Sequence, residues 1–197
     1  TFTNAEEVAA LTSSTAGSGY GGQLGFNIDE PTSTTARYEI KDRFSGALDW
    51  SHKFFGDYAT QIGVYYEGRS GRPYSYIFNN DANGDGRTFN DLFYVPAGPG
   101  DVLFGSMSAA GVFTPNAAME SAFWSWLGAN PQLKPYMGTY APENEFRAGW
   151  VNTFDIRISQ ELPGFFKGHK SRLWLDVQNV GNLLNKDWGH IIDYGFN

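Results

Sequence analysis

The sequence predicts an all-β fold, as part of a large antiparallel transmembrane β-barrel with long extracellular loops, one of which carries a short helix. Several segments of about ten residues alternate apolar and polar side chains, the period that gives a strand two different faces. Aromatic residues make up 17% of the 197 positions and glycine contributes 24, without any long apolar run. The connections between these segments are either very short or very long, as in barrels of the outer membrane.

A membrane-spanning helix is excluded by the lengths of the apolar windows. Such a helix needs about 20 consecutive apolar residues, whereas the most apolar windows, 117–127 and 173–180, are interrupted by Glu120, Asp176 and Gln178. A barrel strand needs only about 9–11 residues, and only one of its sides must be apolar. The low average hydropathy is therefore compatible with a membrane protein.

Charge and cysteine content exclude other classes. The net charge of −7, with 14 Lys and Arg in no dense block, argues against nucleic acid as a partner. The absence of cysteine excludes disulfides and thiolate metal sites. The chain opens at Thr1 with neither the charged nor the apolar region of a signal peptide.

The first strand pair is predicted within residues 43–69. Alternation over 43–53 puts one set of side chains toward lipid, namely Phe44, Gly46, Leu48 and Trp50, and the other toward a lumen, namely Arg43, Ser45, Ala47, Asp49 and Ser51. A tight turn follows at Gly56 and Asp57, and the next strand covers 59–69. Trp50, Phe54 and Phe55 near this turn fit the aromatic girdle of a membrane interface.

The second strand pair is predicted after residue 150. Over 151–160, Phe154, Ile156 and Ile158 alternate with Thr153, Asp155, Arg157 and Ser159. A short turn over 162–170 leads to a strand over 172–180, with Leu173, Leu175 and Val177 facing lipid. A further strand is predicted to start near Trp188.

The segment from Arg69 to Trp150 lacks sustained alternation and is too long for an ordinary connection, so it is predicted to be a functional loop with structure of its own. One helix is predicted in it. Thr114 or Asn116 caps the helix, Pro115 occupies its first turn and Gly128 ends it. Its apolar stripe of Met119, Phe123 and Leu127 packs on the loop itself, or alternatively docks a partner.

The loop also holds a pattern of calcium ligands. Asp81, Asn83 and Asp85 recur at every second position before Gly86, and loops of the form D-x-N-x-D-G bind Ca²⁺ through these side chains. The carbonyl of Arg87 adds a ligand. The twelfth position, where an EF-hand has a bidentate Glu, is Leu92, so that Asp91 or Asn90 must substitute. The alternative is a series of Asn, Asp and Gly turns without an ion.

Other candidates for chemistry are weaker, and an enzyme is the least favoured class. His52, His169 and His190 have no metal-ligand spacing and are interpreted as interfacial polar residues. The serines Ser13, Ser14 and Ser70 lie outside any nucleophile elbow. A further group comprises Arg69, Arg72, Tyr74 and Tyr76. These residues either contact a ligand at the barrel mouth or, as the preferred interpretation, form hydrogen bonds in the lumen or loop.

Several blocks, in order along the chain, carry a family resemblance. They are GRSGRPYSYIF (68–78), DANGDGRTFNDLFYVP (81–96), AFWSWLGANPQLKPY (122–136), NEFRAGWVNTFDIRISQELP (144–163) and LWLDVQNVGNLLNKDWGH (173–190). Together they resemble the C-terminal barrel region of a TonB-dependent outer-membrane receptor, of the Oar-like group that carries a carboxypeptidase-regulatory-like domain. SSTAGSGY at 13–20 resembles an outer loop of that group.

The resemblance implies a bacterial outer-membrane location, with lipid around the barrel, and transport of an unidentified substrate driven through the TonB energy-coupling complex. It also implies that residues 1–197 are a fragment of one barrel domain without the plug and the last strand. Residues 1–42 would be mostly outer loop, 43–69 two strands with a short turn, 70–149 a long extracellular loop and 150–197 the later strands. Two alternatives remain open, a surface-exposed binding or adhesion protein and a soluble calcium-binding β-domain.

Overall fold

The computed structural model describes residues 1–8, 23–27, 30 and 32–194, which form a mostly β structure. This agrees with the all-β class expected from the sequence. The chain divides into two compact units. The sheet unit comprises Thr1–Asn4, Tyr38–Arg72 and Arg147–Tyr194, and the core unit comprises the described residues of Ala5–Arg37 and Pro73–Phe146.

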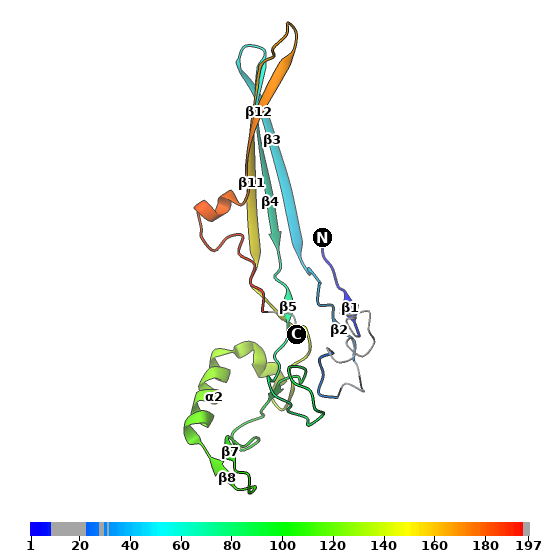
Figure 1. The fold of residues 1–197 in the computed structure, drawn as a ribbon, viewed down its shortest axis with the longest axis vertical. Coiled ribbons are helices and arrows are strands. Elements are labelled where there is room, and N and C mark those ends of the chain that lie inside the picture. The colour runs from blue at the N-terminus through cyan, green and yellow to red at the C-terminus, as the bar shows by residue number, and fades with distance from the viewer. Residues whose placement is uncertain (9–22, 28–29, 31, 195–197) are drawn as a thin grey trace. The chain divides into compact units, whose positions relative to one another are not determined.

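The sheet unit is built on one antiparallel sheet, called here the long sheet. Within the described residues its strand order is β12-β11-β4-β3, and Figure 1 shows the four strands side by side. The strands are β3 (Arg43–Phe55), β4 (Tyr58–Arg69), β11 (Val151–Pro163) and β12 (Lys170–Val177). Gly56 opens the two-residue turn between β3 and β4 with a φ of +61°, which glycine adopts without steric cost and which tight hairpin turns favour.

The long sheet is open. Among the described residues, β3 and β12 each pair with one neighbouring strand, and no closed barrel forms. Each of these edge strands therefore has a row of backbone N–H and C=O groups without a sheet partner in the described structure. The all-β part of the fold prediction is thus observed, whereas a closed barrel is not present in the described part of the chain.

The end of the sheet unit differs from the sequence prediction. Strand β12 ends at Val177 rather than at residue 180, because Asn179 takes a left-handed conformation and donates its N–H to Asp155 Oδ1 at 2.7 Å. The predicted strand near Trp188 is wrong, since described residues 184–194 contain turns and irregular chain but no strand. Instead the short helix η2 (Val180–Leu183) follows, and the Trp188 ring stacks on Phe154.

The core unit is built from short strand pairs and two helical segments. The pairs are β1 (Glu6–Glu7) with β2 (Thr34–Thr35), β5 (Pro73–Tyr74) with β10 (Phe146–Arg147), β6 (Tyr94–Val95) with β9 (Thr139–Tyr140), and β7 (Gly105–Met107) with β8 (Phe113–Pro115). The helical segments are α2 (Ala117–Ala129) and η1 (Pro131–Tyr136). The long segment after Arg69 therefore has structure of its own, as expected.

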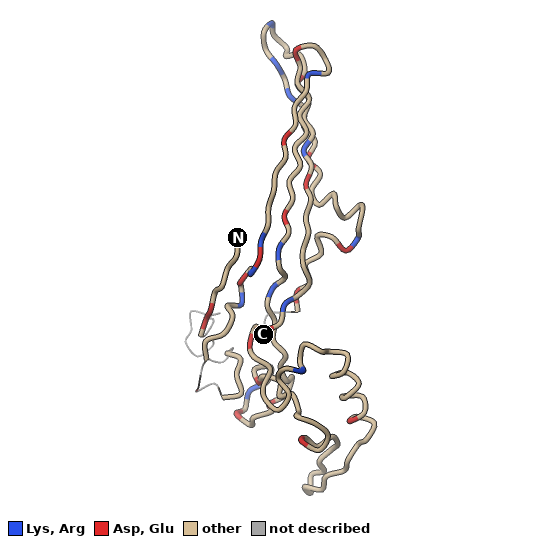
Figure 2. The backbone as a smooth tube through the Cα atoms, turned by 180° about the vertical axis from the view of Figure 1, so that it is seen from behind, with Lys and Arg blue, Asp and Glu red and all other residues tan. Residues whose placement is uncertain are grey.

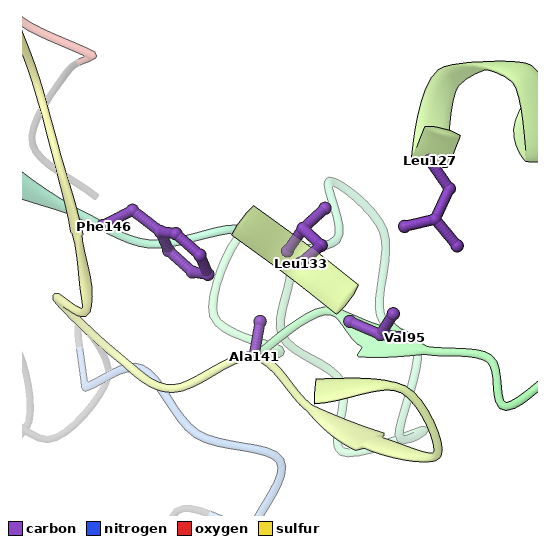
Figure 3. Close-up of a cluster of buried hydrophobic side chains, with 5 residues drawn as sticks. All are labelled: Val95, Leu127, Leu133, Ala141 and Phe146. Atoms are coloured by element: carbon purple, nitrogen blue, oxygen red, sulfur yellow. The ribbon is translucent and has the colours of Figure 1, made fainter. Parts of the chain in front are cut away.

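A hydrophobic cluster holds these short elements together. Figure 3 shows its five buried residues gathered from separate elements, namely Val95, Leu127, Leu133, Ala141 and Phe146. Aromatic side chains pack around them, among them Tyr74, Tyr76, Phe93, Phe123, Trp124 and Tyr136. Burial of this apolar surface is the main stabilising contribution available to strands that are only two or three residues long.

Helix α2 begins at the predicted cap. The Asn116 side chain accepts a hydrogen bond from the Met119 N–H at 3.1 Å, which satisfies one of the free donors of the first turn. Two details of the prediction are wrong. Pro115 belongs to β8 rather than to the first helical turn, and the helix continues past Gly128 to Ala129, where Asn130 caps it.

Candidate functional site

The register of the long sheet places apolar side chains on one face of all four strands, called here the apolar face. Residues paired across neighbouring strands point to the same face. One row of this face runs Leu48, Val64, Ile156 and Val177, and the next runs Trp50, Ile62, Ile158 and Leu175. The lipid-facing sets expected separately for each strand therefore form one continuous surface.

The edge strands expose much of this apolar face, whereas Ile62, Val64 and Ile156 on the central strands are intermediate in exposure. Leu48 is 69% exposed, Leu173 is 66% exposed and Leu175 is 60% exposed, although leucine is usually buried in water-soluble proteins. One part is covered, because η2 and Trp188 pack near Phe154. Large contiguous apolar patches on a folded protein mark an interaction surface rather than a water-facing one.

The opposite face, called here the polar face, carries paired charges. Its ion pairs are Arg43–Glu67, Arg69–Glu67, Arg157–Asp176, Lys170–Glu161 and Arg172–Glu161. Arg157 binds Asp176 in the bidentate manner, with hydrogen bonds of 2.6 and 2.8 Å. A hollow of about 300 Å³ lies beside this pair and is also lined by Asp49, Tyr65 and Asp155. Figure 2 shows residues of both charge signs interspersed along these strands.

Exposed aromatic residues gather where the long sheet turns. Both turns, between β3 and β4 and between β11 and β12, lie at the same end of the sheet (Figure 1). Phe54 and Phe55 lie at the first turn, and Phe165 and Phe166 in the second are 98% and 73% exposed. Aromatic side chains at strand ends are typical of the interface between lipid and water.

The core unit contains the predicted calcium loop, folded as a compact turn around Asp81. Its carboxylate accepts hydrogen bonds from the backbone N–H groups of Gly84, Asp85 and Gly86 at 2.7, 3.0 and 2.8 Å. Asn83 Oδ1 accepts from the Asp85 N–H at 2.9 Å. Gly84 and Gly86 have φ values of +81° and +85°, which explains the need for glycine at both positions.

Asp85 and Arg87 complete the outer part of this loop. Asp85 Oδ1 accepts from the Arg87 N–H at 2.9 Å, so Arg87 joins through its N–H, whereas its carbonyl was the predicted ligand. Desolvation raises the pKa of Asp85, but hydrogen bonds from Asn83 and from the Arg87 backbone, together with the charge of Arg87, outweigh it. The pKa of Asp85 is therefore lowered, which favours the carboxylate form.

Asp91 closes the loop from inside the core unit. It is 0% exposed, and its Oδ2 accepts from the N–H groups of Ala82 and Asn83 at 2.6 and 3.3 Å. The structure thus brings Asp81, Asn83, Asp85 and Asp91 into one turn. Among the described residues, no three His, Cys, Asp or Glu side chains form a metal-binding group. A cation here would therefore need amide or backbone oxygens as well.

The loop also holds a distant segment that the sequence analysis missed. Asn83 Nδ2 donates to the carbonyl of Phe26 at 2.7 Å, and the Gly25 N–H donates to the carbonyl of Asn90 at 2.9 Å. The Phe26 ring stacks on Tyr140 with centroids 4.5 Å apart. No local pattern links residues 25 and 26 to a loop so far along the chain, so only the folded structure reveals this contact.

The remaining predicted candidates have structural roles. His52 packs against Trp50 and Phe54 on the sheet, and His169 packs against Phe166, so neither of these interactions involves a second histidine. The structure gives His190 an exposed position after the turn at Gly189. Ser70 accepts a hydrogen bond from the Asp42 N–H at 3.2 Å. Ser13 and Ser14 lie outside the described residues.

The Arg and Tyr candidates make contacts within the structure, and a ligand contact at a barrel mouth stays a prediction. Arg69 lies 3.5 Å from Glu67 and Arg72 lies 3.4 Å from Asp193. Tyr74 packs against Phe146 in the hydrophobic cluster. The Tyr76 hydroxyl donates to Asn130 at 3.4 Å and accepts from Gln132 at 2.9 Å.

Comparison with models of protein families, with curated proteins and with solved structures finds no match to this chain. Within the described residues, no helix has the length and apolar character needed to cross a membrane. The two faces of the long sheet, the loop from Asp81 to Asp91 and the sequence resemblance therefore carry the information on function.

Proposed function

We propose that the long sheet is a membrane-spanning part of a β-barrel in the bacterial outer membrane. The observation that carries this proposal is the in-register apolar face, exposed on its edge strands, on the opposite side of a sheet from a face of ion pairs. In a barrel wall the apolar face contacts lipid and the polar face contacts water in the lumen. Each face then contacts a suitable medium. In water alone, the apolar face would be exposed to water.

The edges of the long sheet support the same proposal. Backbone groups without partners are costly in lipid, so β3 and β12 need further neighbouring strands there. Those strands would complete the barrel. Strand lengths of 13, 12 and 13 residues for β3, β4 and β11 exceed the roughly 9–11 residues needed to cross the bilayer.

The alternative of a soluble calcium-binding β-domain is less well supported. It requires the apolar sides of residues 44–50 and 154–158 to pack against each other in a closed core. The register puts both on the same face of one sheet, where they lie beside rather than opposite each other. A second sheet would have to cover them.

We further propose that the barrel transports a substrate across the outer membrane with energy supplied through TonB. This part rests on the resemblance to TonB-dependent receptors. The intact outer-membrane protein is expected to bind the periplasmic domain of TonB in a pull-down experiment. Failure to bind would favour the alternative, a surface protein that binds or adheres without transport.

The membrane proposal is tested by labelling single cysteines. The chain has no cysteine, so nitroxide labels can be placed at adjacent residues on opposite faces. In the protein reconstituted in lipid vesicles, labels at Leu48→Cys and Leu175→Cys should be relaxed by oxygen dissolved in lipid. Labels at the matched neighbours Ala47→Cys and Asp176→Cys should respond to a water-soluble nickel complex. Equal access of water to all four positions would contradict the proposal.

A further inference from the structure

The loop from Asp81 to Asp91 leaves buried polar atoms without hydrogen-bond partners. Asn90 is 2% exposed and Asp91 is 0% exposed, yet Asn90 Nδ2, Asn90 Oδ1 and Asp91 Oδ1 have no hydrogen-bond partner in the structure. Buried polar groups in folded proteins are nearly always satisfied by protein, water or an ion. Three such atoms on two adjacent residues therefore leave room for a further polar partner or an ion.

The charge of Asp91 identifies the ligand as a cation. No ion pair of the described residues includes Asp91, so its carboxylate is buried with only backbone N–H groups as partners. A buried carboxylate without a compensating positive charge is strongly unfavourable. A cation beside Oδ1 would compensate this charge and satisfy the free oxygen.

The surrounding donors are all oxygens and favour calcium. Asp81, Asn83 and Asp85 present carboxylate and amide oxygens at alternate positions of the same turn. Asn90 and Asp91 follow this turn in the chain, and the buried amide oxygen of Asn90 adds a further oxygen to the set. Ca²⁺ accepts six to eight such oxygens in flexible geometry, whereas Mg²⁺ demands a regular octahedron and retains water.

We propose that this loop binds one Ca²⁺ ion between the outer residues Asp81, Asn83 and Asp85 and the buried pair Asn90 and Asp91. Asn90 and Asp91, at positions ten and eleven of the loop, take the place of the bidentate Glu that an EF-hand has at position twelve. This proposal is independent of the membrane role of the long sheet, because every residue in it belongs to the core unit.

Binding of the ion also fixes the segment around Phe26. The Asn83 side chain donates to the Phe26 carbonyl, and the Asn90 backbone carbonyl accepts from the Gly25 N–H. A cation that orders both asparagines therefore orders residues 25 and 26 as well. The stacking of Phe26 on Tyr140 then transmits the effect to β9. Calcium therefore links two segments that are far apart in the sequence.

Calorimetry of the whole chain with CaCl₂ tests the site. Saturation of one site is expected, with a dissociation constant on the order of 10⁻⁴–10⁻³ M, the range of calcium sites in extracellular modules. Asp85→Asn keeps an oxygen that can accept from the Arg87 N–H and should weaken binding at least ~10-fold, because even the loss of an outer contact to a metal ligand has such an effect. MgCl₂ should give far less heat than CaCl₂.

Asp101→Asn is the matched control. Asp101 also caps a turn of the core unit, accepting from the Tyr94 hydroxyl and the Ala97 N–H at 2.9 Å each, but it takes no part in the loop. Its replacement should leave calcium binding unchanged. An equal loss of binding in Asp101→Asn would overturn the assignment to this loop, as would the absence of heat with wild-type protein.

Hydrogen exchange gives a second measurement, which detects the effect of calcium already in the wild-type chain. Calcium should slow exchange in peptides covering residues 23–27 and 81–91 of the wild-type chain, and Asn90→Ala should reduce this protection at both places. If calcium protects the loop but not residues 23–27, the proposed link between the segments is wrong. Protection at neither place would overturn the site itself.

Discussion

The two units use the same kinds of apolar side chain in opposite ways. In the core unit, Val95 and Leu133 are fully buried, and aromatic rings from several elements surround them. In the long sheet, Leu48 and Leu175 are more than half exposed. Alternation along the strands gives the long sheet an apolar face and a polar face. Among the described residues, the segment that contains η2 and Trp188 covers part of the apolar face. Burial within the chain stabilises the first unit, whereas the second needs an external apolar partner.

The largest effect is expected from truncating the centre of the core unit. Leu133 in η1 is 0% exposed, so Leu133→Ala removes buried methyl groups and leaves a cavity. We expect the free energy of unfolding of the core unit to fall by about 2–5 kcal/mol. Chemical denaturation followed by hydrogen exchange of core-unit peptides measures this change.

A matched substitution in the same unit provides the control. Leu103 is 76% exposed, and Leu103→Ala should change the free energy of unfolding by no more than about 0.5 kcal/mol. If the two variants lose equal stability, the cluster around Leu133 is not the core that stabilises this unit, and the contrast between the units disappears.

A charge placed on the apolar face should have the next largest effect. In the proposed barrel, Leu48→Arg puts a guanidinium toward lipid, which costs about 2–4 kcal/mol at the midplane of a bilayer. Ser51→Arg, on the polar face of the same strand, should cost far less because the proposed lumen is hydrated. Reversible folding into lipid vesicles, titrated with urea, compares the two variants. Equal costs would mean that the two faces have the same surroundings.

The smallest effect concerns a half-buried acid of the core unit. Burial raises the pKa of Glu143 above its ordinary value of 4.5, and the nearby Glu7 raises it further, against opposing effects from Thr34 and Arg37. A carboxyl with a raised pKa in the folded state contributes stability at low pH, and this contribution is lost as pH rises through the folded pKa.

Glu143→Gln should therefore make the core unit slightly more stable than wild type at neutral pH and about equally stable near pH 4, where both side chains are uncharged. The amide oxygen can still accept the hydrogen bond that Thr34 donates to Glu143 at 3.3 Å. Thermal unfolding across this pH range measures the difference. A variant less stable than wild type at neutral pH would show that attraction between Glu143 and Arg37 dominates.

The strands of the long sheet could be predicted because the signal is local. Alternation over residues 43–53 and 151–160 assigns each side chain to a face without knowledge of any other strand, and the observed register agrees with that assignment. The cap at Asn116 is local in the same way. Helix and strand ends were less accurate, because Pro115 and Asn179 respond to contacts outside their own segment.

The calcium loop was predictable only in part. The spacing of Asp81, Asn83 and Asp85 is visible in the sequence, and so is the lack of a Glu at the twelfth position. The burial of Asn90 and the contact with Phe26 depend on packing between distant segments, for which a single sequence carries no signal. The same holds for the short strands of the core unit, which are too brief to show a period.

The pairing of β5 with β10 affects the assembly of the long sheet. Strands β4 and β11 are neighbours, although the whole of residues 70–150 separates them along the chain. Closing so long a flexible loop costs roughly 4 kcal/mol of conformational entropy. Residues 73–74 and 146–147 are already side by side once β5 and β10 pair. Pairing of β5 with β10 before the long sheet forms would shorten the effective loop to a few residues, so that β4 and β11 would associate almost as a local hairpin.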